Sequence, residues 1–102
     1  MMTVEVLDKA REQIARPGGW CQGLPRDGAV CAVIALAKAG KGYHREPIRL
    51  LRKAIRRHGV AEWNDKPGRR QATVVRAFDR AIALARTASR PHDATDPAEA
   101  AS

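Results

Sequence analysis

The residues best suited to nucleophilic catalysis in this 102-residue chain are a cysteine and two histidines. Cys31 opens an apolar run, and the amide groups at a helix N-terminus stabilise a thiolate. His44 or His58 could then act as the base, with Asn64 or Asp65 orienting it. Neither histidine lies in a supporting motif, and a cysteine among alanines is usually a packing residue. We therefore predict that the chain is not an enzyme, with a Cys31 thiol enzyme as an alternative.

A metal site would need the same residue types. Cys21, Cys31, His44 and His58 are separated by ten, thirteen and fourteen residues, whereas zinc ligands usually include a close pair such as CxxC. No glycine-rich phosphate loop follows a predicted strand either. The sequence predicts no metal and no cofactor.

The strongest signal for binding chemistry is a basic segment, residues 45–58, which reads REPIRLLRKAIRRH. It carries six of the nineteen Lys and Arg residues of the chain and one opposing acid, Glu46. Ile48, Leu51 and Ile55 are spaced so that an apolar stripe of a helix can pack inward while the cations face water. Arginine presents a planar donor fork to phosphates and carboxylates. The segment predicts an acidic partner, either nucleic acid or an acidic protein surface.

A second group of arginines would extend this surface if the last helix packs beside the basic one. Arg76 and Arg80 are one turn apart, and Arg69 and Arg70 precede the helix, where backbone amides can also meet a phosphate. We find no helix-turn-helix spacing, zinc finger or aromatic stacking platform, so sequence-specific readout is not expected. The candidate binding residues are Arg45, Arg49, Arg52, Lys53, Arg56, Arg57, Arg69, Arg70, Arg76 and Arg80.

The overall charge agrees with a polyanionic partner. The formal net charge is +8, and arginine outnumbers lysine by fourteen to five. A GC-rich genome would produce the same arginine bias. In that alternative interpretation the basic segment is a solvated surface whose cations pair with Glu12, Glu46 or Asp79.

A polar cluster, Trp63-Asn64-Asp65, allows two interpretations. An aromatic anchor beside polar groups is typical of a contact site. Alternatively, Trp63 fills the core while Asn64 or Asp65 hydrogen-bonds the backbone of the turn that follows. We favour this structural role, since Asn and Asp are the usual residues for it.

Four helices are expected to position these side chains. The first spans residues 3–16 and is capped by Thr3. The second spans residues 27–39, begins at Asp27 as its cap and stops at Gly40. It is apolar nearly all round, so it is expected to be the buried central helix.

The basic segment and residues 70–88 form the other two helices. On the last helix, one apolar face comprises Val74, Phe78, Ala81, Ile82 and Ala85. The predicted fold class is all-α, a compact small bundle of about four helices over residues 1–89, followed by a disordered tail, residues 90–102. There is no long apolar run for a membrane span, and two cysteines are too few for a disulfide scaffold, which favours a cytoplasmic setting.

Several short motifs resemble a family of small bacterial and phage proteins of unknown function. They are Trp20-Cys21-Gln22-Gly23, then Arg26-Asp27, then Ala29-Val30-Cys31-Ala32. The most specific block is the stretch from Glu62 to Arg69 followed by Phe78-Asp79-Arg80-Ala81-Ile82. The resemblance covers most of residues 5–85. It implies a fold unit and no activity, and it carries no catalytic residues across.

We therefore predict a small basic, non-enzymatic accessory protein that binds nucleic acid without strong sequence specificity. The alternative is a phage-type modulator that docks the same surface on an acidic protein, with Trp20, Tyr43 or Leu50 as apolar anchors. Leu50, Val75 and Leu84 fall outside the main core stripes, which leaves a homodimer as a further alternative.

Overall fold

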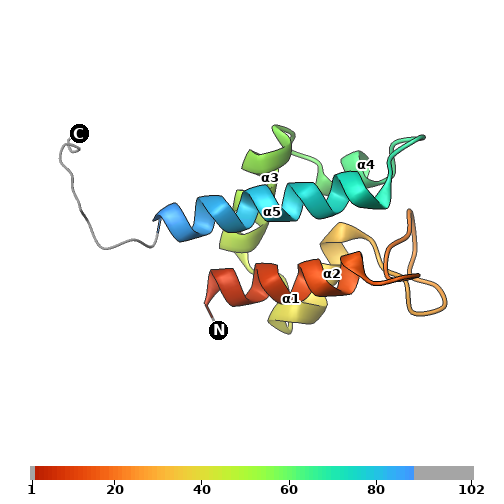
Figure 1. The fold of residues 1–102 in the computed structure, drawn as a ribbon, viewed down its shortest axis with the longest axis horizontal. Coiled ribbons are helices and arrows are strands. Elements are labelled where there is room, and N and C mark those ends of the chain that lie inside the picture. Colours follow the sequence, from red (N-terminus) through yellow and green to blue (C-terminus); the bar gives the residue numbers. More distant parts are fainter. Residues whose placement is uncertain (1, 89–102) are drawn as a thin grey trace.

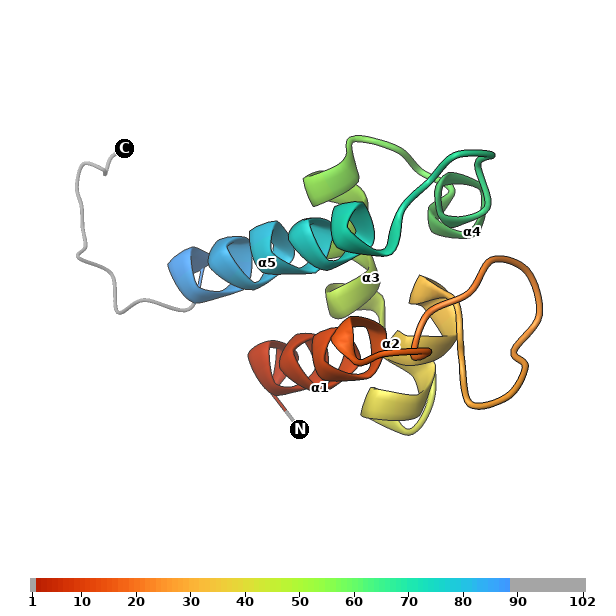
Figure 2. The same cartoon turned by 45° about the vertical axis from the view of Figure 1, so that its right-hand side comes forward.

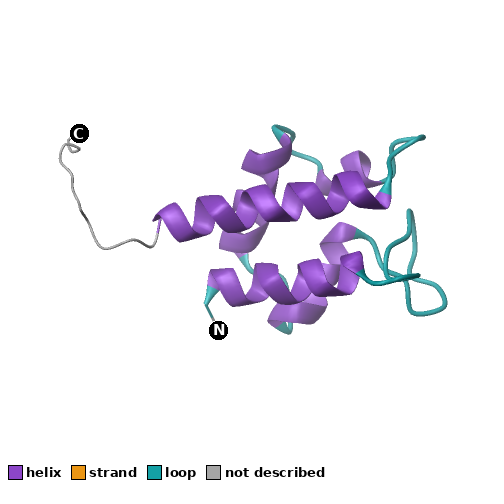
Figure 3. Ribbon diagram, viewed as in Figure 1, coloured by secondary structure: helices purple, strands orange, loops and turns teal. Residues whose placement is uncertain are grey.

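The computed structural model describes residues 2–88, and over this range it contains five helices and no strand (Figure 3). The helices are α1 (Thr3–Ala15), α2 (Ala32–Gly40), α3 (Arg45–Ile55), α4 (Val60–Asn64) and α5 (Gln71–Ala88). The all-α fold with four longer helices is confirmed, and the short α4 is an addition that the sequence did not predict. The predicted tail, residues 90–102, lies outside the described residues. No helix in the described range is long and apolar enough to cross a membrane.

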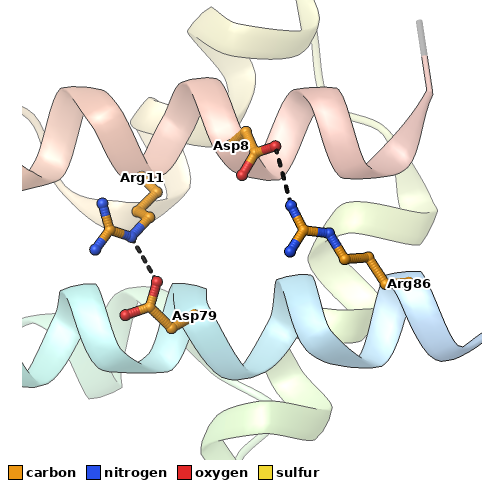
Figure 4. Close-up of polar contacts among 4 residues, drawn as sticks. All are labelled: Asp8, Arg11, Asp79 and Arg86. Carbon is orange, nitrogen blue, oxygen red and sulfur yellow. Dashed lines mark hydrogen bonds and ion pairs between the residues drawn. The ribbon is translucent and has the colours of Figure 1, made fainter.

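Helices α1 and α5 lie side by side and run antiparallel (Figure 1). Two ion pairs join them, from Arg11 to Asp79 and from Arg86 to Asp8 (Figure 4). The hydrogen bond to Asp79 raises the pKa of Arg11. Because these side chains are largely exposed, the pairs contribute little free energy but align the two helices. Asp79 thus pairs with α1 and not with the basic segment.

The core lies between α5 and the helices on either side of it. Helix α3 crosses behind α5 (Figure 2) and packs chiefly on it. The predicted apolar face of α5 is confirmed as fully buried, and Phe78 is its largest side chain. On α3 the buried face is rotated from the predicted one, because Leu50 is 3% exposed while Ile48 and Ile55 are only half-buried. Leu50 therefore belongs to the core and cannot anchor a partner.

The second helix begins five residues later than predicted. Asp27 is not a helix cap: it has a φ of 52° and Gly28 has a φ of 85°. Arg26 and Ala29 exchange two backbone hydrogen bonds around them. Positive φ at both central residues is the signature of a tight type I′ turn, for which Asp-Gly is a favoured pair. The chain reverses here and enters α2 only at Ala32.

Helix α2 is also not the central helix of the bundle. It packs mainly against α1, and its buried residues are Ala32, Ala35 and Leu36, while Val33 and Ile34 are half-buried. The apolar composition of α2 therefore does not mean that the helix is buried on all sides.

Helix α1 differs from the prediction at its start. Met2 and not Thr3 occupies the cap position, and the Met2 amide donates to the Glu5 carboxylate.

Candidate nucleic-acid interface

The exposed side of α3 carries a line of arginines. Arg45, Arg49 and Arg52 are exposed and follow a helical spacing of four and three residues, and Arg56 comes directly after the helix. They lie on the side of α3 opposite its buried face, which includes Leu51. At 1.5 Å of rise per residue the line is roughly 16 Å long. We call these four residues the arginine stripe.

One acid neutralises part of the stripe. Glu46 accepts two hydrogen bonds from Arg49, from Nε at 2.9 Å and from Nη2 at 2.7 Å. This hydrogen bonding lowers the pKa of Glu46 and raises the pKa of Arg49. Both groups therefore stay charged at neutral pH, and Arg49 reaches a partner with its charge already paired. Arg45, Arg52 and Arg56 form no hydrogen bond or ion pair through their side chains within residues 2–88.

Helix α5 contributes Arg80 to the C-terminal end of α3. Nη1 of Arg80 donates to the carbonyl oxygen of Ala54 at 3.2 Å. The last carbonyls of a helix lack partners within the helix and carry partial negative charge, so a guanidinium there is favourable. Arg76, one turn earlier, is exposed and donates to Thr73 Oγ1 at 3.4 Å. Arg80 thus has a structural task besides any contact with a partner.

A hollow of about 530 Å³ opens where Arg80 meets α3. Its floor is apolar and its rim is cationic. The lining residues are Lys53, Ala54, Arg56, Arg80, Ala83, Leu84 and Thr87.

Two further hollows continue along the basic surface. One, of about 360 Å³, is lined by Arg49, Arg52, Lys53, Arg56, Arg57 and His58. The other, which we call the α4 cleft, has a volume of about 830 Å³ and is lined by Ile55, Arg57, His58, Gly59, Ala61, Glu62, Trp63, Asp65, Lys66, Pro67 and Arg69. Arg57 and His58 line both, so the arginine stripe leads directly into the α4 cleft. His58 was considered only as a catalytic base or a metal ligand. Lys66 was not predicted as a site residue, because it lies outside the basic segment of residues 45–58.

Inside the α4 cleft, Arg69 stacks on Trp63. The guanidinium carbon of Arg69 lies 4.4 Å from the centre of the Trp63 ring, and its Nε donates to the Trp63 carbonyl oxygen at 2.9 Å. Cation–π attraction and this hydrogen bond hold the two groups together. The expectation that the chain has no aromatic stacking platform for bases stays a prediction, because this contact joins two side chains of the protein itself. The two residues are six apart and meet only because the turn at residues 65–68 reverses the chain.

Arg70, another of the ten predicted residues, is exposed and precedes α5. Its backbone carbonyl accepts from the amides of Thr73 and Val74. Arg45, Arg70 and Arg76 line none of the three hollows. The other seven predicted residues line adjoining hollows: Arg49, Arg52, Lys53, Arg56, Arg57, Arg69 and Arg80.

Asn64 is the buried polar centre beneath the α4 cleft, with 0% of its surface exposed. Its Oδ1 accepts from Trp20 Nε1 at 2.7 Å and from the Ala32 amide at 3.0 Å. Its Nδ2 donates to the Cys21 carbonyl and to Asp65 Oδ1. Asn64 has a structural role, as expected, but the predicted bond to the backbone of the following turn is wrong. Apart from the carboxylate of Asp65, its partners lie in residues 20–32.

Three further hydrogen bonds connect the loop of residues 20–31 to residues 64–66. Gln22 Nε2 donates to the carbonyls of Asn64 and Lys66, at 3.1 and 2.7 Å. Asp65 Oδ1 accepts from the Gly23 amide at 2.8 Å. The motif residues at 20–23 and at 63–65 therefore bind one another and hold the wall of the α4 cleft in place. Trp63 itself is half-buried at the edge of the core.

The alternative thiol site is not assembled in this arrangement. Cys31 is the residue before α2, not part of its first turn, and it is 8% exposed. His44 Nε2 lies 2.7 Å from the Gly40 carbonyl oxygen, and His58 lines the hollows beside α3. Within residues 2–88 no hydrogen bond links the Cys31 thiol to a histidine, and no three His, Cys, Asp or Glu side chains gather where they could hold a metal ion.

Comparison with known proteins gives a family but no activity. No curated protein and no solved structure shows significant similarity to the chain. One family model matches residues 2–84, which include all five helices except the last residues of α5. The chain therefore belongs to the Family of unknown function (DUF6197).

Proposed function

We propose that the protein is a non-enzymatic accessory protein that binds nucleic acid through the arginine stripe and the cationic hollows beside it, without strong sequence specificity. The observation that carries the proposal is the exposure of Arg45, Arg52 and Arg56 on one face, with a single acid beside them. Phosphate contacts of this kind supply affinity and no base readout. The two free cysteines support a cytoplasmic setting.

Salt dependence tests this proposal directly. Each phosphate neutralised adds about −0.9 to the slope of log affinity against log salt. Four contacts would weaken binding by about a hundredfold between about 50 and 200 mM salt. Fluorescence anisotropy with labelled single-stranded DNA, duplex DNA and RNA measures this slope. Absence of binding to all three at the lower salt would overturn the proposal.

A pair of triple variants separates the stripe from general charge. Arg45, Arg52 and Arg56 are changed to Gln in one protein, and the exposed cations Lys9, Arg26 and Lys38, which lie outside α3, are changed to Gln in the control. Both proteins lose three positive charges. The first should lose about 2.7 from the magnitude of the slope, and the control should lose much less. Equal losses would show that net charge, not this surface, attracts the nucleic acid.

A protein partner is the second candidate. The hollow between α3 and α5 joins an apolar floor at Ala83 and Leu84 to a cationic rim, and Tyr43 is 63% exposed just before α3. Such a surface suits an acidic amphipathic segment, as a phage-type modulator of a host complex would require. Binding to a protein should persist at about 200 mM salt because the apolar contacts are not screened.

A further inference from the structure

We propose that the α4 cleft receives an unpaired base, so that the protein binds single-stranded nucleic acid in preference to duplex. This inference rests on the proposed function and specifies its substrate class. The starting point is continuity: the hollow along the arginine stripe and the α4 cleft share Arg57 and His58. A sugar-phosphate backbone that binds along the arginine stripe therefore reaches the opening of the α4 cleft.

The cleft contains a stacking surface at its inner wall. The guanidinium carbon of Arg69 lies 4.4 Å from the centre of the Trp63 ring. Unpaired bases stack on aromatic rings and on arginine guanidinium planes in the same manner. The hydrogen bond from Arg69 to the Trp63 carbonyl holds the plane in position before a ligand arrives, so little side-chain entropy is lost on binding.

The charges of the cleft distinguish a base from a bare phosphate. Glu62 and Asp65 line it together with the cations Lys66 and Arg69. Carboxylates repel a phosphate but accept hydrogen bonds from the amino groups of base edges. Paired bases in a duplex do not expose their faces, so a stacking wall inside a cleft of about 830 Å³ can act only on an unpaired base.

Hydrogen bonds join the cleft wall to a loop that is distant in the sequence. Gln22 donates to the carbonyls of Asn64 and Lys66, and Gly23 donates to Asp65. These bonds connect the loop of residues 20–31 to the cleft from 42 or more residues away. A preformed site of this kind binds with a smaller ordering cost than a flexible loop.

The test compares two arginine-to-lysine variants that keep the charge. Arg69→Lys removes the stacking plane, while Arg26→Lys changes an exposed arginine that lines none of the three hollows and serves as the control. The probes are a 12-nucleotide single strand with one 2-aminopurine, the same strand with abasic sites in place of its bases, and its duplex. The wild type should bind the full strand at least about fivefold more tightly than the abasic strand, the low end of what stacking one base contributes. The fluorescence of the 2-aminopurine in the strand should fall when the wild-type protein binds.

Arg69→Lys should lose this preference and the fluorescence change, while Arg26→Lys should keep both. If the wild type binds strand, abasic strand and duplex equally, the inference is wrong although the proposed function stands. If no probe binds at about 50 mM salt, the proposed function fails first. The abasic comparison uses the wild-type protein, so it decides the matter even if Arg69→Lys unfolds.

Discussion

Replacing Asn64 by alanine would leave three polar groups of the interior without a partner. The amide of Ala32 and the carbonyl of Cys21 belong to buried residues, and Trp20 Nε1 is partly buried. An unsatisfied buried group costs about 1–3 kcal/mol. Water can reach the Trp20 nitrogen in part, so we expect a total loss of about 3–5 kcal/mol in the free energy of unfolding. That is a large share of the stability of about 5–10 kcal/mol that a domain of this size has.

Urea denaturation followed by circular dichroism measures this loss. The midpoint should fall while the slope m stays constant, because the surface exposed on unfolding is almost unchanged. In a thermal scan the melting temperature should fall by more than about 10 °C. A loss below about 1 kcal/mol would refute the reasoning that these bonds are satisfied only by Asn64.

The matched control is Asp65→Ala in the adjacent residue. Asp65 is exposed, and water can replace it as acceptor for the Gly23 amide and for Asn64. We expect a loss of about 1 kcal/mol or less. If Asp65→Ala instead abolished ligand binding without lowering the melting temperature, contact with the ligand, and not support of the fold, would be the main role of Asp65.

Three more predictions follow from the contacts of single side chains. Glu46→Gln should release Arg49 and increase nucleic-acid affinity by up to about tenfold at about 50 mM salt, measured by anisotropy. The bond to Arg49 lowers the pKa of Glu46, so the ion pair is present at neutral pH. It is lost only as the pH falls below the ordinary carboxyl range. At such a pH the affinity of the wild type for nucleic acid should rise toward that of the variant. Cys31 should resist iodoacetamide in the native protein and react after unfolding, since it is 8% exposed. Peptide mass mapping measures this labelling. Rapid labelling of the native protein would instead support the alternative of a Cys31 thiol enzyme. Leu50→Ala should cost about 2–5 kcal/mol in urea denaturation because Leu50 is 3% exposed, whereas Tyr43→Ala should cost under about 0.5 kcal/mol because Tyr43 lies on the surface.

Local sequence was sufficient for the elements whose pattern repeats over several turns. The apolar residues of α5 recur at three and four positions, so the face containing Val74 and Phe78 could be assigned without tertiary information. The extent of α1 and the existence of a basic helix at α3 were equally readable. Where the pattern was short or the composition uniform, as in α2, neither the start of the helix nor its position in the bundle followed.

The remaining features depend on groups that are distant in the chain. Helix α2 begins at Ala32 because its first amide finds an acceptor in Asn64, 32 residues later, and because Asp27 and Gly28 take up a reversing turn. The same long-range packing decided that Leu50 is buried and that Arg69 covers Trp63. Helical periodicity is a property of neighbours, and so the sequence alone determined the existence of α1, α3 and α5 and the sign of their surface charge. Satisfying a buried polar group requires a partner from elsewhere in the fold, so only the tertiary structure could form the Asn64 centre and the cleft above it.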